Sequence, residues 1–244
     1  MPWATLAGLS AEPGMLTRLG PVTPVQARHL ADLTAGDPGG QWRVVVTGPS
    51  GQARAAARIP RRSHPVPGQR DGPGQRDGPD RVHDSAGLVG RVTLVLPAEL
   101  LGAPPGEIIQ RGGVLAAALR AVARAVTAAG AAAAADAAAG GCAHCGQSLA
   151  YRAPPALRDW VTVRDITCRF PSCRRPAWRG DLDHTIAWDQ GGRTCRCNLG
   201  GLCREHHILK QHPDWSLTQD SPGVFRWVTS AGHTYTVIPD AHAA

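Results

Sequence analysis

Asp181-Leu-Asp-His184 is followed by Asn198-Leu199 and then by Cys203-Arg-Glu-His-His207-Ile-Leu-Lys210. A carboxylate and a histidine are neighbours, an asparagine comes 14 residues after the histidine, and His207 comes 9 residues after the asparagine. Carboxylates and imidazoles can hold a divalent cation, and a nearby imidazole can activate a water molecule. The order of these residues therefore predicts a small metal-dependent site for hydrolysing phosphodiester bonds.

Hydrolysis of a phosphodiester needs a base, a cation and fixed geometry, and each requirement has a candidate. His184 is the candidate base because imidazole titrates near neutral pH. Asp183 would point to the other side of a strand and, together with His207 on the following helix, would hold the cation. Asn198 would either orient His184 or tie down the loop through its amide.

Two ligand pairs predict a structural zinc site. Cys168-x4-Cys173 provides one pair on a turn, and Cys203-x2-His206 provides the other on one face of a helix. Three thiolates and an imidazole match the closed tetrahedral site of structural zinc, which also supplies folding free energy. The adjacent histidines, His206 and His207, would then serve different ions. The alternative is a set of unrelated buried thiols.

The remaining cysteines offer a second set of zinc ligands. Cys142-x2-Cys145 has the spacing of a zinc knuckle, and Cys195-x-Cys197 could complete it. The seven cysteines of the chain and His206 make eight ligands, which is enough for two tetrahedral ions. Because Cys-x-Cys is a less usual spacing, free thiols in a loop are the alternative for that pair.

The composition favours an anionic partner inside the cell. The 244-residue chain has a formal net charge of +7, and its seven cysteines all lie between Cys142 and Cys203. Positive charge favours nucleic acid, and clustered cysteines without a signal sequence favour metal binding over disulfides. No apolar run reaches the roughly 18 residues needed to span a membrane. We therefore expect a cytoplasmic protein that binds DNA and has no membrane segment; the sequence identifies no protein partner.

The first part of the chain divides by composition into two regions. Residues 1–60 predict a helix near 24–34 and a strand at 42–47. Residues 61–85 contain the tandem repeat Gly-Gln-Arg-Asp-Gly-Pro and have little apolar content. Such a segment cannot bury enough apolar surface to fold, so it predicts a disordered linker.

The rest of the chain divides into a helical region and a cysteine-rich region. Residues 86–149 predict a strand at 91–96 and an alanine-rich helix at 113–139. Residues 150–240 begin with a predicted helix at 156–165, which carries the expected core residue Trp160. Beyond the cysteines, strands are predicted at 215–218, 224–229 and 234–238.

The residues of the predicted site resemble the HNH endonuclease motif. The resemblance is carried by Asp183-His184, Gly191-Gly192, Asn198-Leu199, Leu202-Cys203 and His206-His207-x-x-Lys210. More closely, the chain resembles actinobacterial proteins of the 13E12-repeat type, which join a helical DUF222 domain to a C-terminal HNH nuclease. Arg164-Asp-x-Thr-Cys168-Arg-Phe-Pro-x-Cys173 is similar to that family's lead-in, and the specific resemblance covers 150–238.

The resemblance implies a fold, an activity and a set of roles. The implied fold is α+β: a mainly helical, truncated DUF222-like N-terminal region, then a zinc-stabilised ββα-metal domain (His-Me finger). The implied activity is cleavage of DNA with a catalytic Mg or Mn ion, or Zn, beside a structural zinc ion. By position, His184 takes the base role, Asp183 and His207 the metal roles, and Asn198 the role of the family's asparagine.

Basic residues of the same region are candidates for phosphate contact. Arg164, Arg193 and Lys210 belong to a segment, 151–215, with 11 Lys or Arg against 7 Asp or Glu. Lys210 could instead cap its helix. The alternative to an endonuclease is a zinc-stabilised nucleic-acid-binding module without catalytic activity, derived from a mobile or repeated element, in which the histidines are structural.

Overall fold

The computed structural model describes residues 1–59 apart from 7, 9, 17 and 18, together with 90–99, Arg124 and 150–242. The expected linker at 61–85 lies outside the described residues, as do Cys142 and Cys145. Apart from Arg124, the expected alanine-rich helix at 113–139 lies outside them too.

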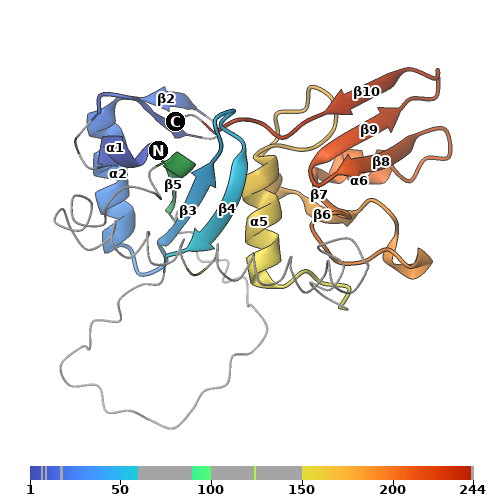
Figure 1. Cartoon of the computed structure of the whole chain (residues 1–244), viewed down its shortest axis with the longest axis horizontal. Coiled ribbons are helices and arrows are strands. Elements are labelled where there is room, and N and C mark those ends of the chain that lie inside the picture. Colours follow the sequence, from blue (N-terminus) through green and yellow to red (C-terminus); the bar gives the residue numbers. More distant parts are fainter. Residues whose placement is uncertain are drawn as a thin grey trace, which may run out of the picture.

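A three-stranded sheet forms the centre of the N-terminal region (Figure 1). β3 (Gln41–Thr47) lies between β4 (Ala53–Arg58), which is antiparallel to it, and β5 (Arg91–Pro97), which is parallel to it. Because side chains alternate along a strand, the valines of β3 serve two cores. Val44 and Val46 pack with Leu94 on one face, whereas Val45 packs on the other.

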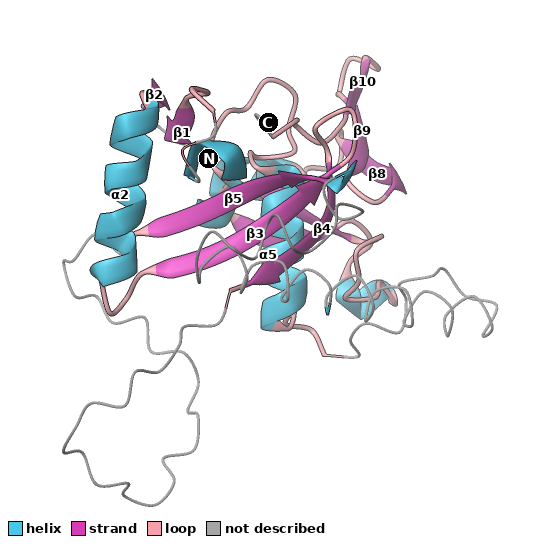
Figure 2. Ribbon diagram, turned by 60° about the vertical axis from the view of Figure 1, so that its left-hand side comes forward, coloured by secondary structure: helices cyan, strands magenta, loops and turns pink. Residues whose placement is uncertain are grey.

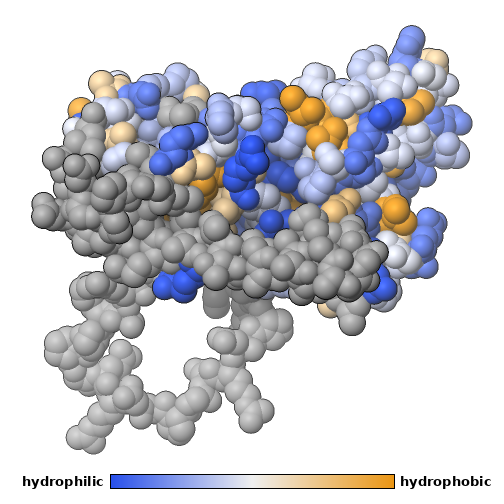
Figure 3. Space-filling model, in the orientation of Figure 1, coloured by the Kyte–Doolittle hydropathy of each residue, from blue (hydrophilic) through white to orange (hydrophobic). Residues whose placement is uncertain are grey.

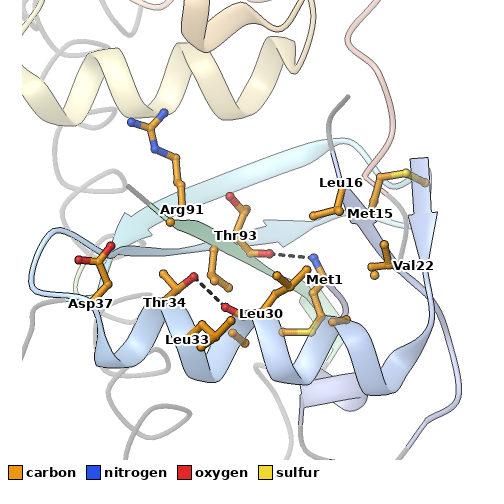
Figure 4. Close-up of a pocket in the computed structure, with 15 residues that line it drawn as sticks. Met1, Met15, Leu16, Val22, Leu30, Leu33, Thr34, Asp37, Arg91 and Thr93 are labelled. Carbon is orange, nitrogen blue, oxygen red and sulfur yellow. Dashed lines mark hydrogen bonds between the residues drawn. The ribbon is translucent and has the colours of Figure 1, made fainter. Parts of the chain in front are cut away.

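A helix and a small hairpin lie beside the β5 edge of this sheet (Figure 2). α2 (Pro24–Gly36) begins with a capping box in which Thr23 and Gln26 satisfy each other's backbone amides. β1 (Gly14–Leu16) pairs antiparallel with β2 (Gly20–Val22), and α1 (Trp3–Leu6) precedes them. A mostly apolar cavity of about 450 Å³ lies between α2 and β5 (Figure 4).

The expected fold class, with a mainly helical N-terminal region, is wrong. The described residues before 60 form β1, β2, β3 and β4 beside two helices, and β5 follows. The error is clearest in β4, whose sequence Ala-Arg-Ala-Ala-Ala-Arg favours a helix by intrinsic propensity. Pairing with β3 overrides that propensity, because strand formation depends on the neighbouring strand and on burial.

α5 (Pro155–Asp165) joins the sheet to the C-terminal region (Figure 1). Its first turn begins with proline. Proline suits this position because an amide hydrogen in the first turn would have no acceptor within the helix, so its absence costs nothing. Val163 packs against Val45 of the sheet, while Trp160 and Val161 pack against Leu199 beyond the helix. The prediction of a helix at 156–165 with Trp160 in the core is confirmed.

The C-terminal region begins with a hairpin and a short helix. β6 (Asp181–His184) pairs antiparallel with β7 (Leu199–Leu202), and α6 (Arg204–Leu209) follows directly. Two 3-10 turns, η2 (Ala177–Arg179) and η3 (Trp188–Gln190), flank β6. The strand that carries the acidic residues is therefore held beside the helix that carries the histidines.

A second three-stranded sheet covers the cysteine cluster. The three strands predicted here are present as β8 (Ser216–Ser221), β9 (Val224–Val228) and β10 (Thr234–Val237), and they are antiparallel in the order β10-β9-β8. Phe225 and Trp227 of β9 are fully buried against two of the cysteines. The chain then returns to the first sheet, where the amide of His242 donates to the carbonyl of Gly51.

The face of the molecule drawn in Figure 3 is mixed in hydropathy. On the face drawn in Figure 3, small hydrophobic patches are separated by hydrophilic residues. No helix in the described part of the chain combines the length and apolar character that crossing a bilayer requires.

Candidate metal centre and active site

Three cysteines and one histidine meet at the start of α6. The ligand atoms of Cys168, Cys173, Cys203 and His206 all lie within 4.8 Å of one another. His206 Nδ1 is 3.1 Å from Cys203 Sγ and 3.5 Å from Cys168 Sγ. Tetrahedral zinc bonds of about 2.0–2.3 Å would space such atoms by about 3.3–3.8 Å. The predicted grouping is confirmed, and the four residues can bind a metal ion such as zinc.

The surroundings of this cluster hold the ligands in place. The Phe170 ring stacks on His206 with 3.7 Å between ring centroids, and the edge of Trp227 meets Phe170 at 5.2 Å. The indole nitrogen of Trp227 donates to the carbonyl of Arg169 at 2.7 Å, which fixes the turn that carries Cys168. The imidazole is therefore positioned by aromatic packing before any ion arrives.

The thiols need a cation to become thiolates. Burial raises the pKa of the Cys168 thiol to about 12, although the backbone amide of Cys203 favours its thiolate. A bound metal ion reverses this preference, because a coordinating thiol is deprotonated outright. Binding should therefore release protons and add to the stability of the fold.

Only two of the four ligands expected for a second zinc ion are among the described residues. Cys195 is buried and Cys197 is half-buried in the loop between β6 and β7, and burial raises the pKa of Cys197. Their expected partners, Cys142 and Cys145, lie outside the described residues. The second zinc ion therefore stays a prediction.

The acidic residues of β6 face α6. Asp181 and Asp183 are two residues apart on a strand and so project to the same side. His207 lies between them: its Nδ1 is 2.7 Å from Asp181 Oδ2 and its Nε2 is 3.1 Å from Asp183 Oδ1. The hydrogen bond from His207 holds the pKa of Asp181 below its usual range, with a further contribution from Arg204. Asp183 and His207, the two expected cation ligands, are thus in contact.

Lys210 completes this contact from the end of α6. Its Nζ donates to Asp183 Oδ2 at 2.6 Å and to the carbonyl of His184. The expected roles for this lysine were a phosphate contact or a helix cap, and the observed partner is instead the carboxylate of the site. Lys210 therefore neutralises Asp183 and joins α6 to β6.

Asn198 ties down the loop between the two strands of the hairpin. Its Oδ1 accepts from the Ile186 amide at 2.7 Å, and its Nδ2 donates to the carbonyls of Ile186 and Arg193 at 2.9 and 3.0 Å. A Cβ on Gly192 would lie 1.8 Å from the Ile186 carbonyl oxygen, so only glycine fits this close approach. Of the two expected roles for Asn198, these contacts match the second, that of fixing the loop.

His184 is the last residue of β6, and its ring contacts the segment before α5 and the loop between β6 and β7. The Tyr151 ring stacks on it at 5.4 Å with an interplanar angle of 17°, and its Nε2 is 2.8 Å from Thr194 Oγ1. Burial lowers the pKa of His184; Asp183 opposes this shift and Lys210 adds to it. The ring is therefore predominantly neutral at pH 7, as a base must be.

A polar cavity of about 300 Å³ opens beside these residues. Its lining includes Asp181, His184 and His207 together with Arg152, Arg158 and Arg204. The larger cavity between α2 and β5 is mostly apolar, and the candidate acid–base and metal residues named above do not line it. The smaller cavity is consequently the one whose chemistry suits an anion such as a phosphate.

Arg164, an expected phosphate contact, is committed to the protein interior. It is 3% exposed, and its guanidinium makes a bidentate pair with Asp165 at 2.7 and 3.0 Å. It also donates to the carbonyls of Arg196 and Leu199. Arg164 therefore joins α5 to β7 and is not available to DNA, whereas the Arg193 side chain is exposed.

Sequence reasoning missed several residues of the site. Asp181 could have been found, because it is two positions before Asp183 on the same strand. Arg152, Arg158 and Tyr151 precede or belong to α5, more than 20 residues from His184, so only the fold brings them to the cavity. They carry no spacing signal of their own.

Comparisons with known proteins give relatives without an assigned activity. The chain is 37% identical over 146 residues to the uncharacterized protein Rv3776 of Mycobacterium tuberculosis, a match that covers 59% of this chain and 27% of that protein. It is 42% identical over 90 residues to the uncharacterized protein Rv2100 of the same organism, covering 36% of this chain and 16% of that protein. The chain thus matches about a quarter or less of the length of these relatives. No family model and no solved structure matches it, so its function is inferred from the geometry of the site.

Proposed function

We propose that the region from about 150 to 240 is a metal-dependent endonuclease of the HNH type that hydrolyses phosphodiester bonds in DNA. The observation that carries the proposal is the shared cavity, where a buried neutral histidine, a histidine between two carboxylates and three arginines line about 300 Å³. A base, candidate cation ligands and phosphate-binding groups are the three requirements of the reaction.

The contacts of His207 support a cation site at Asp183. Both neighbouring carboxylates can only accept hydrogen bonds, so both ring nitrogens can donate only if the ring is protonated. With Nδ1–H held by Asp181, Nε2 of the neutral ring would offer its lone pair beside Asp183. A carboxylate behind a metal-binding histidine is a common arrangement. A divalent cation such as Mg²⁺ or Mn²⁺, or Zn²⁺, would neutralise charge on the scissile phosphate and the leaving oxygen.

His184 takes the role of the base. Its ring is neutral at pH 7 because burial lowers its pKa, and it lines the cavity that a phosphate would enter. It would accept the proton of a water molecule as that water attacks phosphorus. Asn198 has no part in proton transfer in this scheme and acts by fixing the loop after β6.

DNA is the proposed partner because the cavity wall is basic. Arg152, Arg158 and Arg204 line it, and arginine binds phosphate through paired hydrogen bonds. Contacts of this kind make binding weaker as salt rises. Cys168, Cys173 and Cys203 form no disulfide, which favours a reducing compartment such as the cytoplasm.

One observation favours a second candidate, a zinc-stabilised module that binds nucleic acid without cleaving it. Lys210 already neutralises Asp183 and touches the carbonyl of His184. A cation at Asp183 would have to share the carboxylate with this ammonium group or displace it. If neither occurs, the arginines would bind DNA and no hydrolysis would follow.

A nicking assay separates the two candidates. Supercoiled plasmid is incubated with the purified protein and Mg²⁺ or Mn²⁺, beside His184→Ala and, as a matched control, His233→Ala in the exposed turn before β10. We expect the wild type and His233→Ala to nick the plasmid. We expect His184→Ala to lose at least about 100-fold in rate, as removal of a general base does, with unchanged zinc content.

Two outcomes of this assay would contradict the proposed nuclease mechanism. Equal nicking by His184→Ala and the wild type would exclude His184 as the base. Absence of nicking under every divalent metal, with salt-sensitive DNA binding retained, would support the binding module instead.

A further inference from the structure

A buried hydroxyl contacts the candidate base. Thr194 lies in the loop between β6 and β7 and is fully buried. Its Oγ1 is 2.8 Å from His184 Nε2 and 3.3 Å from the carbonyl oxygen of Tyr151. A buried threonine hydroxyl is expected to satisfy both of its neighbours.

The single hydrogen of the Thr194 hydroxyl fixes the direction of both hydrogen bonds. The hydroxyl has one hydrogen, and the Tyr151 carbonyl can only accept, so the hydroxyl donates to Tyr151. Its lone pair then accepts from His184, which must carry a hydrogen on Nε2. In a neutral ring the other nitrogen, Nδ1, therefore has the free lone pair. No protein group in the described part of the chain donates to Nδ1.

We propose that Thr194 is a positioning residue that fixes the Nε2–H tautomer of His184 and so reserves Nδ1 for accepting a proton from water. The catalytic consequence rests on the proposed function, whereas the tautomer does not. A base held in the wrong tautomer presents a hydrogen where a lone pair is needed, which makes this assignment decisive for activity.

Tyr151 supplies both halves of the arrangement. Its carbonyl orients the Thr194 hydroxyl, and its ring stacks on His184. The ring of Trp188 in η3 meets Tyr151 edge-on at 5.9 Å and supports it from the loop between β6 and β7. The segment before α5 thus fixes the plane of the imidazole directly and its tautomer through Thr194.

The same loop holds Thr194 in position. Asn198, four residues further on, donates to the carbonyl of Arg193 directly before Thr194. The hydrogen bond from Asn198 therefore fixes the position of the backbone that carries Thr194, from which the hydroxyl reaches His184. This gives Asn198 an indirect path to the base that its contacts with Ile186 alone do not explain.

The test is a comparison of histidine ¹⁵N spectra of the full chain at pH 8. The variants are Thr194→Val, which keeps the shape without the hydroxyl, and Thr194→Ser, which keeps the hydroxyl. Thr218→Val is the matched control, because it removes an exposed threonine hydroxyl of β8. We expect the Nε2–H pattern for His184 in the wild type, Thr194→Ser and Thr218→Val. In Thr194→Val we expect the Nδ1–H form to appear.

Cleavage rates give the second readout. We expect Thr194→Val to lose about 10- to 100-fold in rate, in the range found when a group behind an active residue is removed, and Thr194→Ser to recover most of it. Zinc content should not change. Thr194→Ala, which cannot overpack the loop, repeats the comparison if Thr194→Val fails to fold.

Two results would overturn the proposal. One is a wild-type His184 with its hydrogen on Nδ1, and the other is an unchanged tautomer in both Thr194→Val and Thr194→Ala. A wild type that cleaves nothing but shows the expected spectra would count against the proposed nuclease alone and would leave the role of Thr194 supported.

Discussion

The sheet of β4, β3 and β5 has a core of aliphatic side chains, whereas the region after Cys168 has a core of thiols and aromatic rings. Val44, Val46 and Leu94 form the first core. Cys168, Cys203, Phe225 and Trp227 dominate the second. Aliphatic burial stabilises a fold in water without help, at about 25 cal/mol per Å² of buried apolar area. Thiols at a ligand site contribute most when an ion draws them together.

This difference teaches where metal dependence should lie. The C-terminal region contains short strands, a six-residue α6 and buried charges, all arranged around the four ligands. Its order should therefore depend on the ion, while the sheet should not. Since the candidate active site is built on α6 and β6, its geometry depends on the zinc cluster too.

Removal of a zinc ligand should have the largest effect. We expect Cys203→Ser to abolish protection from hydrogen exchange across 166–237 while β3 and β5 keep theirs. Structural zinc contributes about 10–16 kcal/mol in small domains, which exceeds the stability of most folds. Hydrogen exchange followed by mass spectrometry on the full chain measures both regions at once.

His233→Ala is the control, because His233 is exposed and lies outside the confirmed cluster. It should leave the exchange protection of β8 and β9 intact. Equal loss of protection in β3 after Cys203→Ser would mean that the two regions are one folding unit. It would contradict the claim that only the C-terminal region depends on the metal ion.

Breaking the buried ion pair between Arg164 and Asp165 of α5 should have the next largest effect. Asp165 is fully buried, and it holds Arg164 and the amide of Gly201 in β7. Asp165→Asn would leave the Arg164 charge uncompensated, which typically costs about 3–5 kcal/mol. Chemical denaturation measures this, with Asp220→Asn as the control. Asp220 pairs with Arg226 at the surface, and such pairs contribute about 0–1 kcal/mol. Similar losses in both variants would contradict the structural role of Arg164.

Val45→Ala should weaken the sheet without touching the metal. Val45 is fully buried, with 0% of its surface exposed to solvent, and packs between the sheet and Val163 of α5. Loss of two methyl groups should cost about 2 kcal/mol, from lost transfer free energy and the cavity left behind. Val25→Ala on the exposed side of α2 should cost almost nothing. A fall in zinc content in Val45→Ala would show that the regions are coupled more strongly than their cores suggest.

The smallest effect concerns pH. Burial lowers the pKa of His242 below its ordinary value of 6.5, where its Nε2 donates to the Val163 carbonyl. The unfolded chain therefore binds this proton more readily than the folded protein. The contribution of His242 to the free energy of unfolding is fully present above about pH 6.5 and is lost as the pH is lowered below that value. Denaturation midpoints at pH 8 and pH 5 should differ less in His242→Gln than in the wild type, and an equal difference would contradict the assignment.

The comparison also explains which parts of the fold could be predicted from the sequence. Strands rich in valine and leucine at 42–47 and 91–96 were predictable, because burial on both faces leaves a continuous apolar run. β4 was not predictable, because its alanines favour a helix and only pairing with β3 makes it a strand. The mainly helical expectation for the N-terminal region came from the resemblance to the helical DUF222 domain, and the strands β1 to β5 overturn it.

The candidate site was predictable where spacing carries information. Cys168, Cys173, Cys203 and His206 come together because ligand geometry restricts their spacing. Contacts made across the fold carry no such signal. The burial of Arg164 and the pairing of Lys210 with Asp183 depend on how α5 and α6 pack against the hairpin, which local sequence does not encode.

The claim that the neighbouring histidines serve different ions is tested most directly by the zinc content per chain of His206→Ala and His207→Ala. His206 lies in the cysteine cluster, and His207 lies between Asp181 and Asp183. We predict that His207→Ala keeps the zinc content of the wild type and that His206→Ala contains one zinc ion fewer. Loss of the same zinc ion from both variants would contradict the assignment.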